Sequence, residues 1–139
     1  MTNTQFPVLY ILMRDDLESM NAGKGMAQAS HASNAFLHTV NQNTALAATT
    51  VSLVQKWKDE TEQGFGTAIV LAVNESEMRI KTEIAITLGF VAGIVHDPGY
   101  PIRDGEAHHE IPLDTCAFAF GDRNDDIFRY LFSDLDLHA

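Results

Sequence analysis

Four short apolar runs constrain the fold of this chain more than any other feature. They occupy residues 6–13, 67–73, 90–96 and 115–120, and each is bounded by polar or turn-forming residues. Runs of this length are typical of buried strands, and each is far shorter than the ~20 apolar residues that a membrane-spanning helix requires. We therefore expect four strands and no membrane segment.

Segments with a helical spacing of small and apolar residues lie between and after these runs. The first helix is expected from Lys24 to about Val40, the second from about Ala45 to Glu60 with Thr44 as N-cap, the third from Glu75 to Leu88 with Asn74 or Ser76 as N-cap and Gly89 as C-cap, and the last from Asp126 to about Asp134. The expected order of elements is therefore β-α-α-β-α-β-β-α.

This alternation of strands and helices favours an α/β sheet. The unit formed by residues 67–96 is expected to be a right-handed parallel crossover. The last two strands are instead joined by a predicted Pro/Gly turn at 97–101 and a long polar loop at 102–113, so they can pair antiparallel. The predicted fold is thus a four-stranded mixed β-sheet with helices on both faces. The length of 139 residues fits a single domain, 1–139.

Acidic residues outnumber basic residues by 19 to 9, which gives the chain a net charge of −10. Nucleic-acid-binding proteins commonly carry a basic face, because neutralising phosphates releases counterions. The charge therefore speaks against RNA as a partner and is typical of a soluble protein, although a local basic patch is compatible with it. The single cysteine, Cys116, excludes an intrachain disulfide. Residues 1–5 lack the basic and apolar regions of a signal peptide, so we expect a cytoplasmic protein.

The connection from the first strand into the first helix carries Gly23, Lys24 and Gly25. In open α/β sheets, ligands bind beyond the carboxyl ends of the strands. Glycines let the backbone approach a ligand, and the free N–H groups of a helix start attract anions. Lys24 adds a positive charge, but the spacing is not that of a nucleotide-binding P-loop. By itself the pattern fits a flexible turn with a solvated lysine at least as well as an anion site.

Asp97 directly follows the third strand, at the sheet edge where the first helix is also expected to begin. It is a candidate for the site, but an Asp before Pro-Gly also commonly closes its own turn, so both interpretations stay open. Gln28 lies one helical turn after Lys24 on the same face, and His31 lies close behind. A histidine among Ala and Ser on a packed helix is more often a supporting residue than a base.

The run His108-His109-Glu110 offers side chains that can ligate a metal. Adjacent residues point in different directions, however, and no His or Cys at ligand spacing supports them, so we expect no metal. Cys116 lies within an apolar run, where a buried thiol is usually inert. The chain has no Gly-x-Ser-x-Gly motif, which argues against a serine hydrolase.

Residues 23–32, Gly-Lys-Gly-Met-Ala-Gln-Ala-Ser-His-Ala, resemble a helix motif of the second, archaeal/eukaryotic-type family of peptidyl-tRNA hydrolases. Further matches follow in the family's order and cover nearly the whole chain. They are Met13-Arg14-Asp15-Asp16-Leu17 after the first strand, Val95-His96-Asp97-Pro98-Gly99 after the third, and Ala119-Phe120-Gly121 with the short helix at 127–137 at the end.

The resemblance implies the same mixed sheet with helices on both faces. It also implies hydrolysis of the ester that links a peptide to the terminal ribose of tRNA, without a metal or cofactor. The implied catalytic residues are Lys24, Gln28 and Asp97. Asp97 would orient or deprotonate water, and Lys24 would hold a phosphate or the oxyanion. The positions implied at the substrate are Gly23, Gly25, Gly99 and Cys116, with His31 supporting the site from behind.

The chain departs from the family pattern near the expected site. Ala22 stands where a first lysine is common, Pro98, Tyr100 and Pro101 replace Ala, Arg and Thr, and a strand threonine appears as Cys116, or as Thr115 if the strand slips by one. Two alternatives therefore stay open. One is a non-catalytic protein of the same fold that binds a protein or a small ligand, and the other is a hydrolase of another small ester or amide. A homodimer through a sheet edge or a helix is also left open.

Overall fold

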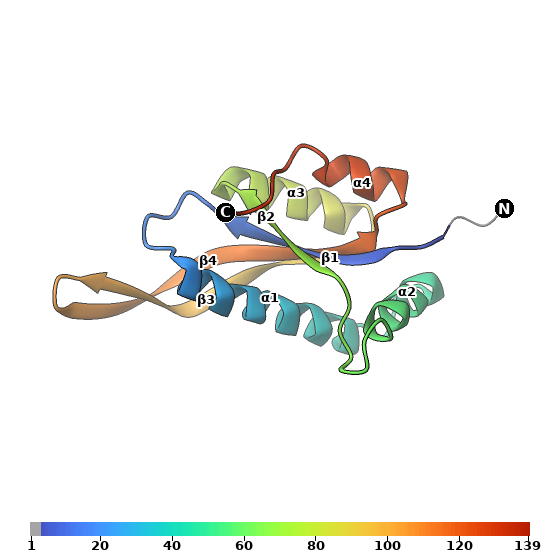
Figure 1. Cartoon of the computed structure of the whole chain (residues 1–139), viewed down its shortest axis with the longest axis horizontal. Helices are drawn as coiled ribbons and strands as arrows, with labels where there is room; N and C mark the ends of the chain where they lie inside the picture. Colours follow the sequence, from blue (N-terminus) through green and yellow to red (C-terminus); the bar gives the residue numbers. More distant parts are fainter. Residues whose placement is uncertain (1–3) are drawn as a thin grey trace.

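A four-stranded sheet lies between two layers of helices in the computed structural model, which describes residues 4–139 (Figure 1). Residues 1–3, which begin the stretch expected to lack a signal peptide, lie outside the described residues. The strands are β1 (Pro7–Arg14), β2 (Ala68–Val73), β3 (Val91–Asp104) and β4 (Ala107–Asp122). The helices are α1 (Ala22–Gln42), α2 (Ala48–Lys58), α3 (Glu75–Thr87) and α4 (Asp126–Phe132). The predicted order of elements is confirmed.

The sheet is mixed, with the strand order β2-β1-β4-β3. β1 and β2 pair in parallel, whereas β4 lies antiparallel to both β1 and β3. β2 and β3 therefore run in the same direction at opposite edges of the sheet, with β1 and β4 between them. The predicted fold class is confirmed, and the segment 67–96 joins two strands of one direction, as expected.

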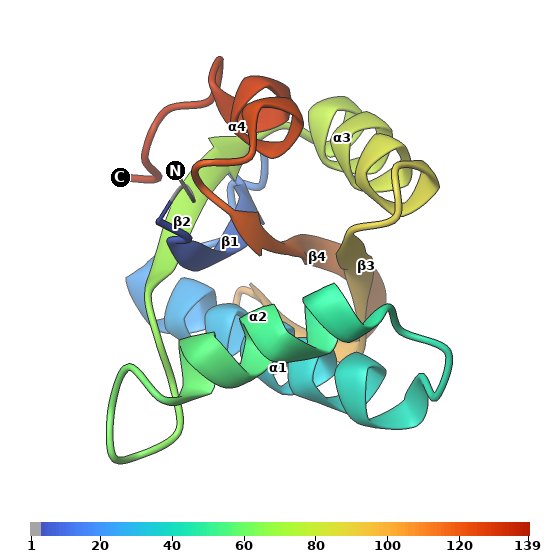
Figure 2. The same ribbon diagram turned by 90° about the vertical axis from the view of Figure 1, so that its right-hand side faces the viewer.

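Helices α1 and α2 cover one face of the sheet, and α3 and α4 cover the other (Figure 2). Successive residues of β1 point to opposite faces, so Leu9 and Ile11 pack toward α1 and α2, and Val8 and Leu12 pack toward α3 and α4. None of these four side chains is more than 3% exposed, which explains why β1 reads as a continuous apolar run. Within residues 4–139, no helix is long and apolar enough to cross a membrane.

The start of α2 differs from the prediction. The Asn43 side chain accepts a hydrogen bond from the Ala45 N–H at 3.0 Å, and this turn holds the chain in a non-helical conformation. The predicted helix start at Ala45 and the predicted cap Thr44 are therefore wrong. The helix begins at Ala48, and its N-cap residue makes no side-chain hydrogen bond.

The N-terminus of α3 carries a capping box formed by Asn74 and Glu77. Asn74 Oδ1 accepts a hydrogen bond from the Glu77 N–H at 2.8 Å, and Glu77 Oε1 accepts one from the Asn74 N–H at 2.9 Å. Asn74 is thus the N-cap, and the alternative, Ser76, is wrong. Gly89 follows the helix with a φ of 90°, a conformation that favours glycine at the end of a helix.

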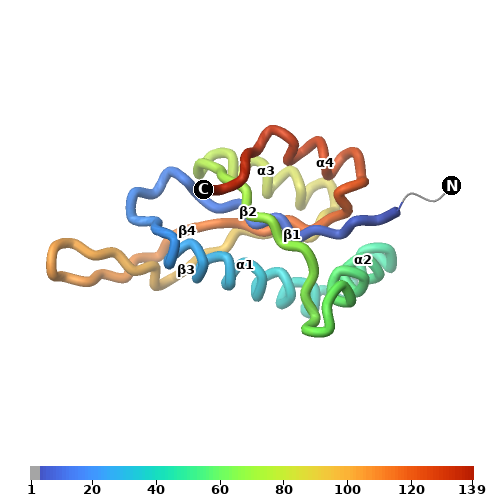
Figure 3. The backbone as a smooth tube through the Cα atoms, in the orientation of Figure 1, coloured from blue at the N-terminus to red at the C-terminus, as the bar shows by residue number. Residues whose placement is uncertain are grey.

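The segment between Asp97 and the fourth predicted strand is a β-hairpin. The predicted turn at 97–101 and the predicted loop at 102–113 are wrong, because β3 and β4 stay paired out to Asp104 and Ala107. The hairpin projects past the start of α1 and away from both helical layers (Figure 3). Beyond the buried Tyr100, most side chains of residues 101–112 are exposed, so the sequence lacks the apolar pattern that marks a strand.

The prolines and the glycine of this segment have places that a strand tolerates. Pro98 and Pro101 lack an N–H group, but β3 lies at the edge of the sheet, where half of the backbone groups need no partner strand. Two register shifts between β3 and β4 absorb the irregular backbone. Gly105 has a φ of 63° and opens the tight turn between the strands, as glycine does in short hairpins.

Gly121, near the end of β4, leaves room for the buried ring of Phe128. A Cβ atom on Gly121 would lie 2.5 Å from Cδ1 of that ring, whereas a Cβ atom on Gly25 would meet nothing within 4 Å. We expect Gly121→Ala to lower the free energy of unfolding by about 1–3 kcal/mol through overpacking. Gly25→Ala is the matched control, and its free energy of unfolding should equal or exceed that of wild type, because alanine favours helices. Urea denaturation measures both, and a Gly121→Ala variant as stable as wild type contradicts the packing.

Candidate active site

A chain of hydrogen bonds joins α1 to the last two strands. The Thr115 hydroxyl donates to Gln28 Oε1 at 2.6 Å, and Gln28 Nε2 donates to Asp97 Oδ2 at 2.7 Å. Thr115 and Gln28 are 0% and 2% exposed, whereas the Asp97 side chain is 14% exposed. The chain of bonds therefore starts in the core and ends on a carboxylate that reaches the surface.

Thr115 reaches Gln28 because β4 has a bulge at this position. The register of β3 and β4 shifts between Val95 and His96, which leaves Thr115 as an extra residue on β4. In a regular strand, Thr115 and Cys116 would point to opposite faces of the sheet. The bulge instead lets both contact Gln28 on α1, because the Cys116 thiol also donates to the Gln28 carbonyl oxygen at 3.5 Å.

The two carboxylate oxygens of Asp97 have different partners. Oδ1 accepts a hydrogen bond from the Gly99 N–H at 2.9 Å, which is the local bond that the turn interpretation involved, formed here at an irregularity of β3. Oδ2 accepts the bond from Gln28 and lies 4.0 Å from His31 Nε2. The local hydrogen bond and a contact with α1 are thus compatible, because each uses its own oxygen.

The pKa of Asp97 is lowered, first of all by the hydrogen bond from Gln28. Burial of the carboxyl opposes this effect, while the Gly99 N–H and the nearby imidazoles of His31 and His96 add to the lowering. Asp97 is therefore ionised at neutral pH. A carboxylate of this kind accepts hydrogen bonds well but takes up a proton reluctantly.

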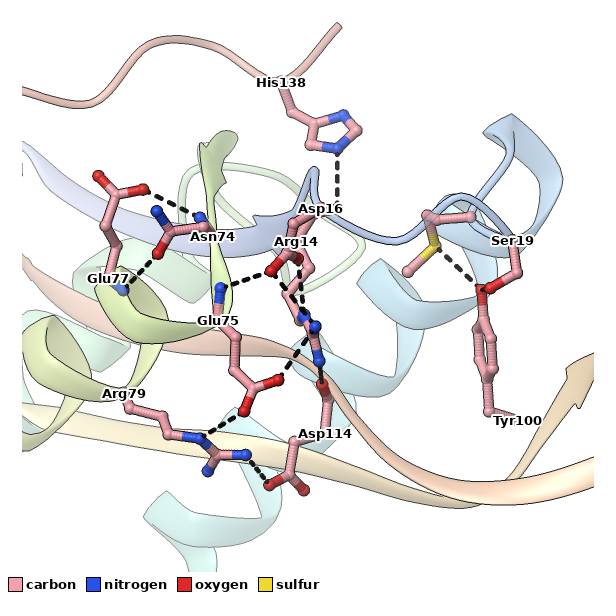
Figure 4. Close-up of polar contacts among 11 residues, drawn as sticks. Arg14, Asp16, Ser19, Asn74, Glu75, Glu77, Arg79, Tyr100, Asp114 and His138 are labelled. Atoms are coloured by element: carbon pink, nitrogen blue, oxygen red, sulfur yellow. Dashed lines mark hydrogen bonds and ion pairs between the residues drawn. The ribbon is translucent and has the colours of Figure 1, made fainter.

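The ammonium group of Lys24 lies over the ring of Tyr100, 5.2 Å from the ring centroid. Tyr100 is fully buried, and its hydroxyl lies 3.1 Å from Ser19 Oγ and 3.9 Å from Met20 Sδ (Figure 4). The backbone N–H of Lys24 donates to Asn21, the N-cap of α1, at 2.9 Å. Within residues 4–139, no acid forms an ion pair with Lys24, so its charge is available to a ligand.

The positions implied at the substrate lie in different surroundings. Gly23 is exposed and Gly25 half-buried in the first turns of α1. Gly99 lies beside the Glu110 carboxylate, which a Cβ atom on the glycine would approach to 3.4 Å. Cys116 is fully buried, and burial raises the pKa of its thiol to about 12. Thr115, and not Cys116, therefore presents the polar group that continues to Gln28 and Asp97.

On the opposite face of the sheet, the guanidinium group of Arg14 supports the bulge (Figure 4). Arg14 is 6% exposed and forms ion pairs with Asp16 at 2.8 Å and Glu75 at 3.1 Å. It also donates to the Asp114 carbonyl oxygen at 3.1 Å. Because Asp114 directly precedes Thr115, this network fixes the bulge from the side opposite α1.

A cavity of about 310 Å³ opens beside Asp97, along the outer edge of β3 and against α1; we call it the β3 groove. Its lining residues are His31, Ala35, Ile94, Val95, His96, Asp97 and Pro98. Lys24 does not line it and contacts Tyr100, on the other side of Asp97. Asp97 thus lies between a positively charged helix start and a largely apolar groove.

The model of the family described as Peptidyl-tRNA hydrolase PTH2 matches residues 7–121. The chain belongs to this family. A search of curated proteins finds no match to the chain. Family membership confirms the resemblance carried by residues 23–32, and with it the expected class of enzyme, a peptidyl-tRNA hydrolase. The matched residues include Thr115, Gln28 and Asp97, so the chain of hydrogen bonds lies wholly within the family domain.

The sequence analysis missed the role of Tyr100 and considered Thr115 only as an alternative to Cys116. Tyr100 lies within the segment 97–101, which we predicted to be a turn, so nothing indicated that its ring is buried beneath Lys24. The one sequence feature that could have indicated its burial is the presence of a large aromatic residue in a largely polar segment. Thr115 was considered only for a strand that slips by one residue, and the bulge produces this shift locally.

Replacing Gln28 by leucine removes the largest cause of the lowered pKa of Asp97. We therefore expect the pKa of Asp97 to rise toward its ordinary value in Gln28→Leu. The ionised carboxylate stabilises the folded state above the ordinary pKa, and this contribution is lost as the pH falls through the lowered value. The variant should accordingly lose less stability between neutral and acid pH than wild type.

A ¹³C NMR titration of the aspartate carboxyl carbons measures the pKa of Asp97 directly. His31→Ala is the matched control, because His31 lies 4.0 Å from the same oxygen and is a smaller cause of the lowering. His31→Ala should also raise the pKa of Asp97, but by less than Gln28→Leu does. An Asp97 pKa that is equal in wild type and Gln28→Leu contradicts the assigned cause.

Proposed function

We propose that the chain hydrolyses the ester between the peptide and the terminal ribose of tRNA with Asp97 orienting the attacking water. The observation that carries this assignment is the 2.7 Å hydrogen bond from the buried Gln28 amide to Asp97. This bond holds an ionised carboxylate at the end of the β3 groove, where water and substrate have access. Family membership supports the class of ester.

The lowered pKa of Asp97 limits the part that the carboxylate takes. A weak base accepts a hydrogen bond from water and aligns a lone pair of the water oxygen with the ester carbonyl. A new bond then forms between the water oxygen and the carbonyl carbon, and the bond from that carbon to the ribose oxygen breaks. The peptide leaves as a carboxylic acid and the ribose as an alcohol, which takes up one proton of the water.

In this proposal, Lys24 provides the positive charge at the site. It is half-buried, stands over the Tyr100 ring and has no acidic partner within residues 4–139. The first turn of α1 adds the partial positive charge of unpaired N–H groups. Negative charge arises at the phosphates of the tRNA end and on the carbonyl oxygen during attack, and both suit this position.

Gln28 is proposed to act through Asp97 and not on the substrate. Its amide oxygen and nitrogen are bonded to Thr115 and Asp97, and the residue is only 2% exposed. A buried amide held from both ends has one orientation, so the lone pairs of Asp97 are held in one direction. Gln28 is therefore a positioning residue, and Cys116, buried behind it, is given no contact with substrate.

A hydrolase of a smaller ester is the second candidate, and the charge of the chain favours it. The net charge of the chain is −10. Ion pairs with acidic side chains also occupy four of its basic residues: Arg14, Arg79, Lys81 and Arg129. The two candidates differ in their salt dependence. With tRNA as ligand, log(kcat/KM) should fall with log[salt] by about 0.7 for each single-strand phosphate contacted. A higher kcat/KM for an N-acetyl amino acid ester than for peptidyl-tRNA, without salt dependence, favours the second candidate.

Asp97→Asn and Lys24→Ala test the assigned roles on peptidyl-tRNA. We expect Asp97→Asn to lower kcat about a hundred- to ten-thousandfold, since an amide orients water poorly. Lys24→Ala should lower kcat/KM about a hundred- to thousandfold through loss of charge stabilisation. Lys58→Ala is the control, because Lys58 lies on α2 at the far end of the molecule (Figure 1). Full activity of both variants overturns the roles, and an inactive wild type favours the non-catalytic alternative.

Tyr100 is expected to hold Lys24 in place through its ring. Tyr100→Leu should raise KM for peptidyl-tRNA about threefold to thirtyfold, the range of one cation–π contact, and leave kcat less affected. Tyr100→Phe keeps the ring and loses only the contacts of the hydroxyl, so it should remain close to wild type in KM. Thermal unfolding of both variants separates lost binding from lost folding. Equal KM values for the Leu and Phe variants contradict this role of the ring.

A further inference from the structure

The two edges of the sheet differ in how they are covered. At the β2 edge, the C-terminal segment pairs with the strand: the Ala72 N–H donates to the Asp136 carbonyl oxygen at 2.8 Å and the His138 N–H to that of Val70 at 3.0 Å. At the opposite edge, β3 pairs with β4 alone within residues 4–139. An edge strand presents a row of N–H and C=O groups that another extended chain can pair with.

The β3 groove runs along this uncovered edge. Ala35 of α1 forms one wall, and Ile94 and Val95 of β3 form the other. The volume of about 310 Å³ is at the lower end of the range of ligand pockets, which is ~300–1,000 Å³. A helix beside an open edge strand is an arrangement that receives an extended peptide, because the strand supplies main-chain partners and the helix covers side chains.

Asp97 divides this region into two sides. Along α1 the order is Lys24, Gln28 and then Ala35, and α1 runs opposite to β3, because Lys24 contacts Tyr100 and Gln28 contacts Asp97. The positive charge therefore lies on one side of Asp97 and the apolar groove on the other. A substrate that joins a polyanion to a peptide through one ester matches this arrangement, with the polyanion on the side of Lys24 and the peptide on the side of the groove.

We propose that the β3 groove binds the peptide part of the substrate as a strand added to β3, with the ester carbonyl at Asp97. This inference rests on the proposed function. The peptide then extends from Asp97 toward Ile94 and Val91, so its N-to-C direction is that of β3, and the two pair in parallel. Main-chain pairing is independent of the peptide's side chains. An ester that carries a single amino acid lacks the peptide groups needed for it.

A series of tRNA esters tests this inference with the wild-type enzyme alone. The acyl groups are N-acetylated alanine oligomers of one to four residues. We expect kcat/KM to rise about fivefold for each main-chain hydrogen bond gained and to level off at the end of the groove. A single N-methyl group moved along the peptide should lower kcat/KM at every second residue, because alternate residues of a strand face its neighbour.

A variant that fills the β3 groove provides a second, independent test of the peptide site. Ala35→Trp should lower kcat/KM for the longest ester toward the value that wild type shows for the shortest one. Asn34→Trp is the matched control, since Asn34 is an exposed neighbour that does not line the groove. Thermal unfolding establishes that both variants are folded. If Ala35→Trp fails to fold, the N-methyl series decides without any substitution.

The outcomes separate this inference from the proposed function. If esters of all acyl lengths are cleaved at one rate and N-methylation has no effect, the proposed peptide site in the β3 groove is wrong, whereas the proposed hydrolysis is unaffected. If no ester is cleaved, the proposed function fails, and ¹⁵N NMR with N-acetyl-tetraalanine amide decides: shifts confined to the amides of residues 92–97 support the peptide site, and their absence overturns it. A dimer that pairs β3 with β3 at the assay concentration, seen by sedimentation and exchange protection, also overturns it.

Discussion

The buried amide of Gln28 is the interaction on which the arrangement of the site depends. An amide that is 2% exposed must have partners for its polar atoms, since leaving one unpaired in the core is costly. Thr115 and Asp97 meet this need from two different strands. The same two bonds that satisfy Gln28 also fix α1 on the sheet and set the direction of the carboxylate. Stability and positioning are therefore not separable at this residue.

The regular parts of the fold could be predicted because their signals are local. Buried strands such as β1 show as apolar runs, and the start of α3 shows as the two cap candidates Asn74 and Ser76, of which the structure uses Asn74. The family motif at residues 23–32 likewise lies in one continuous segment. The site residues on α1 could be named for this reason, and so could Asp97, which directly follows a strand run.

The parts that could not be predicted depend on pairing between distant segments. The outer half of the hairpin has polar residues on both faces, and only its partner strand shows that it is extended. The bulge at Thr115 is a difference of one residue between two strands, which neither sequence segment reveals alone. The place of Tyr100 beneath Lys24 requires both the hairpin and the start of α1.

The pairing of residues 136–138 with β2 has a consequence for assembly. A sheet with one covered edge can accept a single additional strand, so its growth ends after one step. If the C-terminal segment were detached, both edges would be open and would run in the same direction. Successive copies could then join head to tail without closing into a ring, which is the geometry of a fibre. In the structure, residues 136–138 occupy part of the β2 edge that such growth would use.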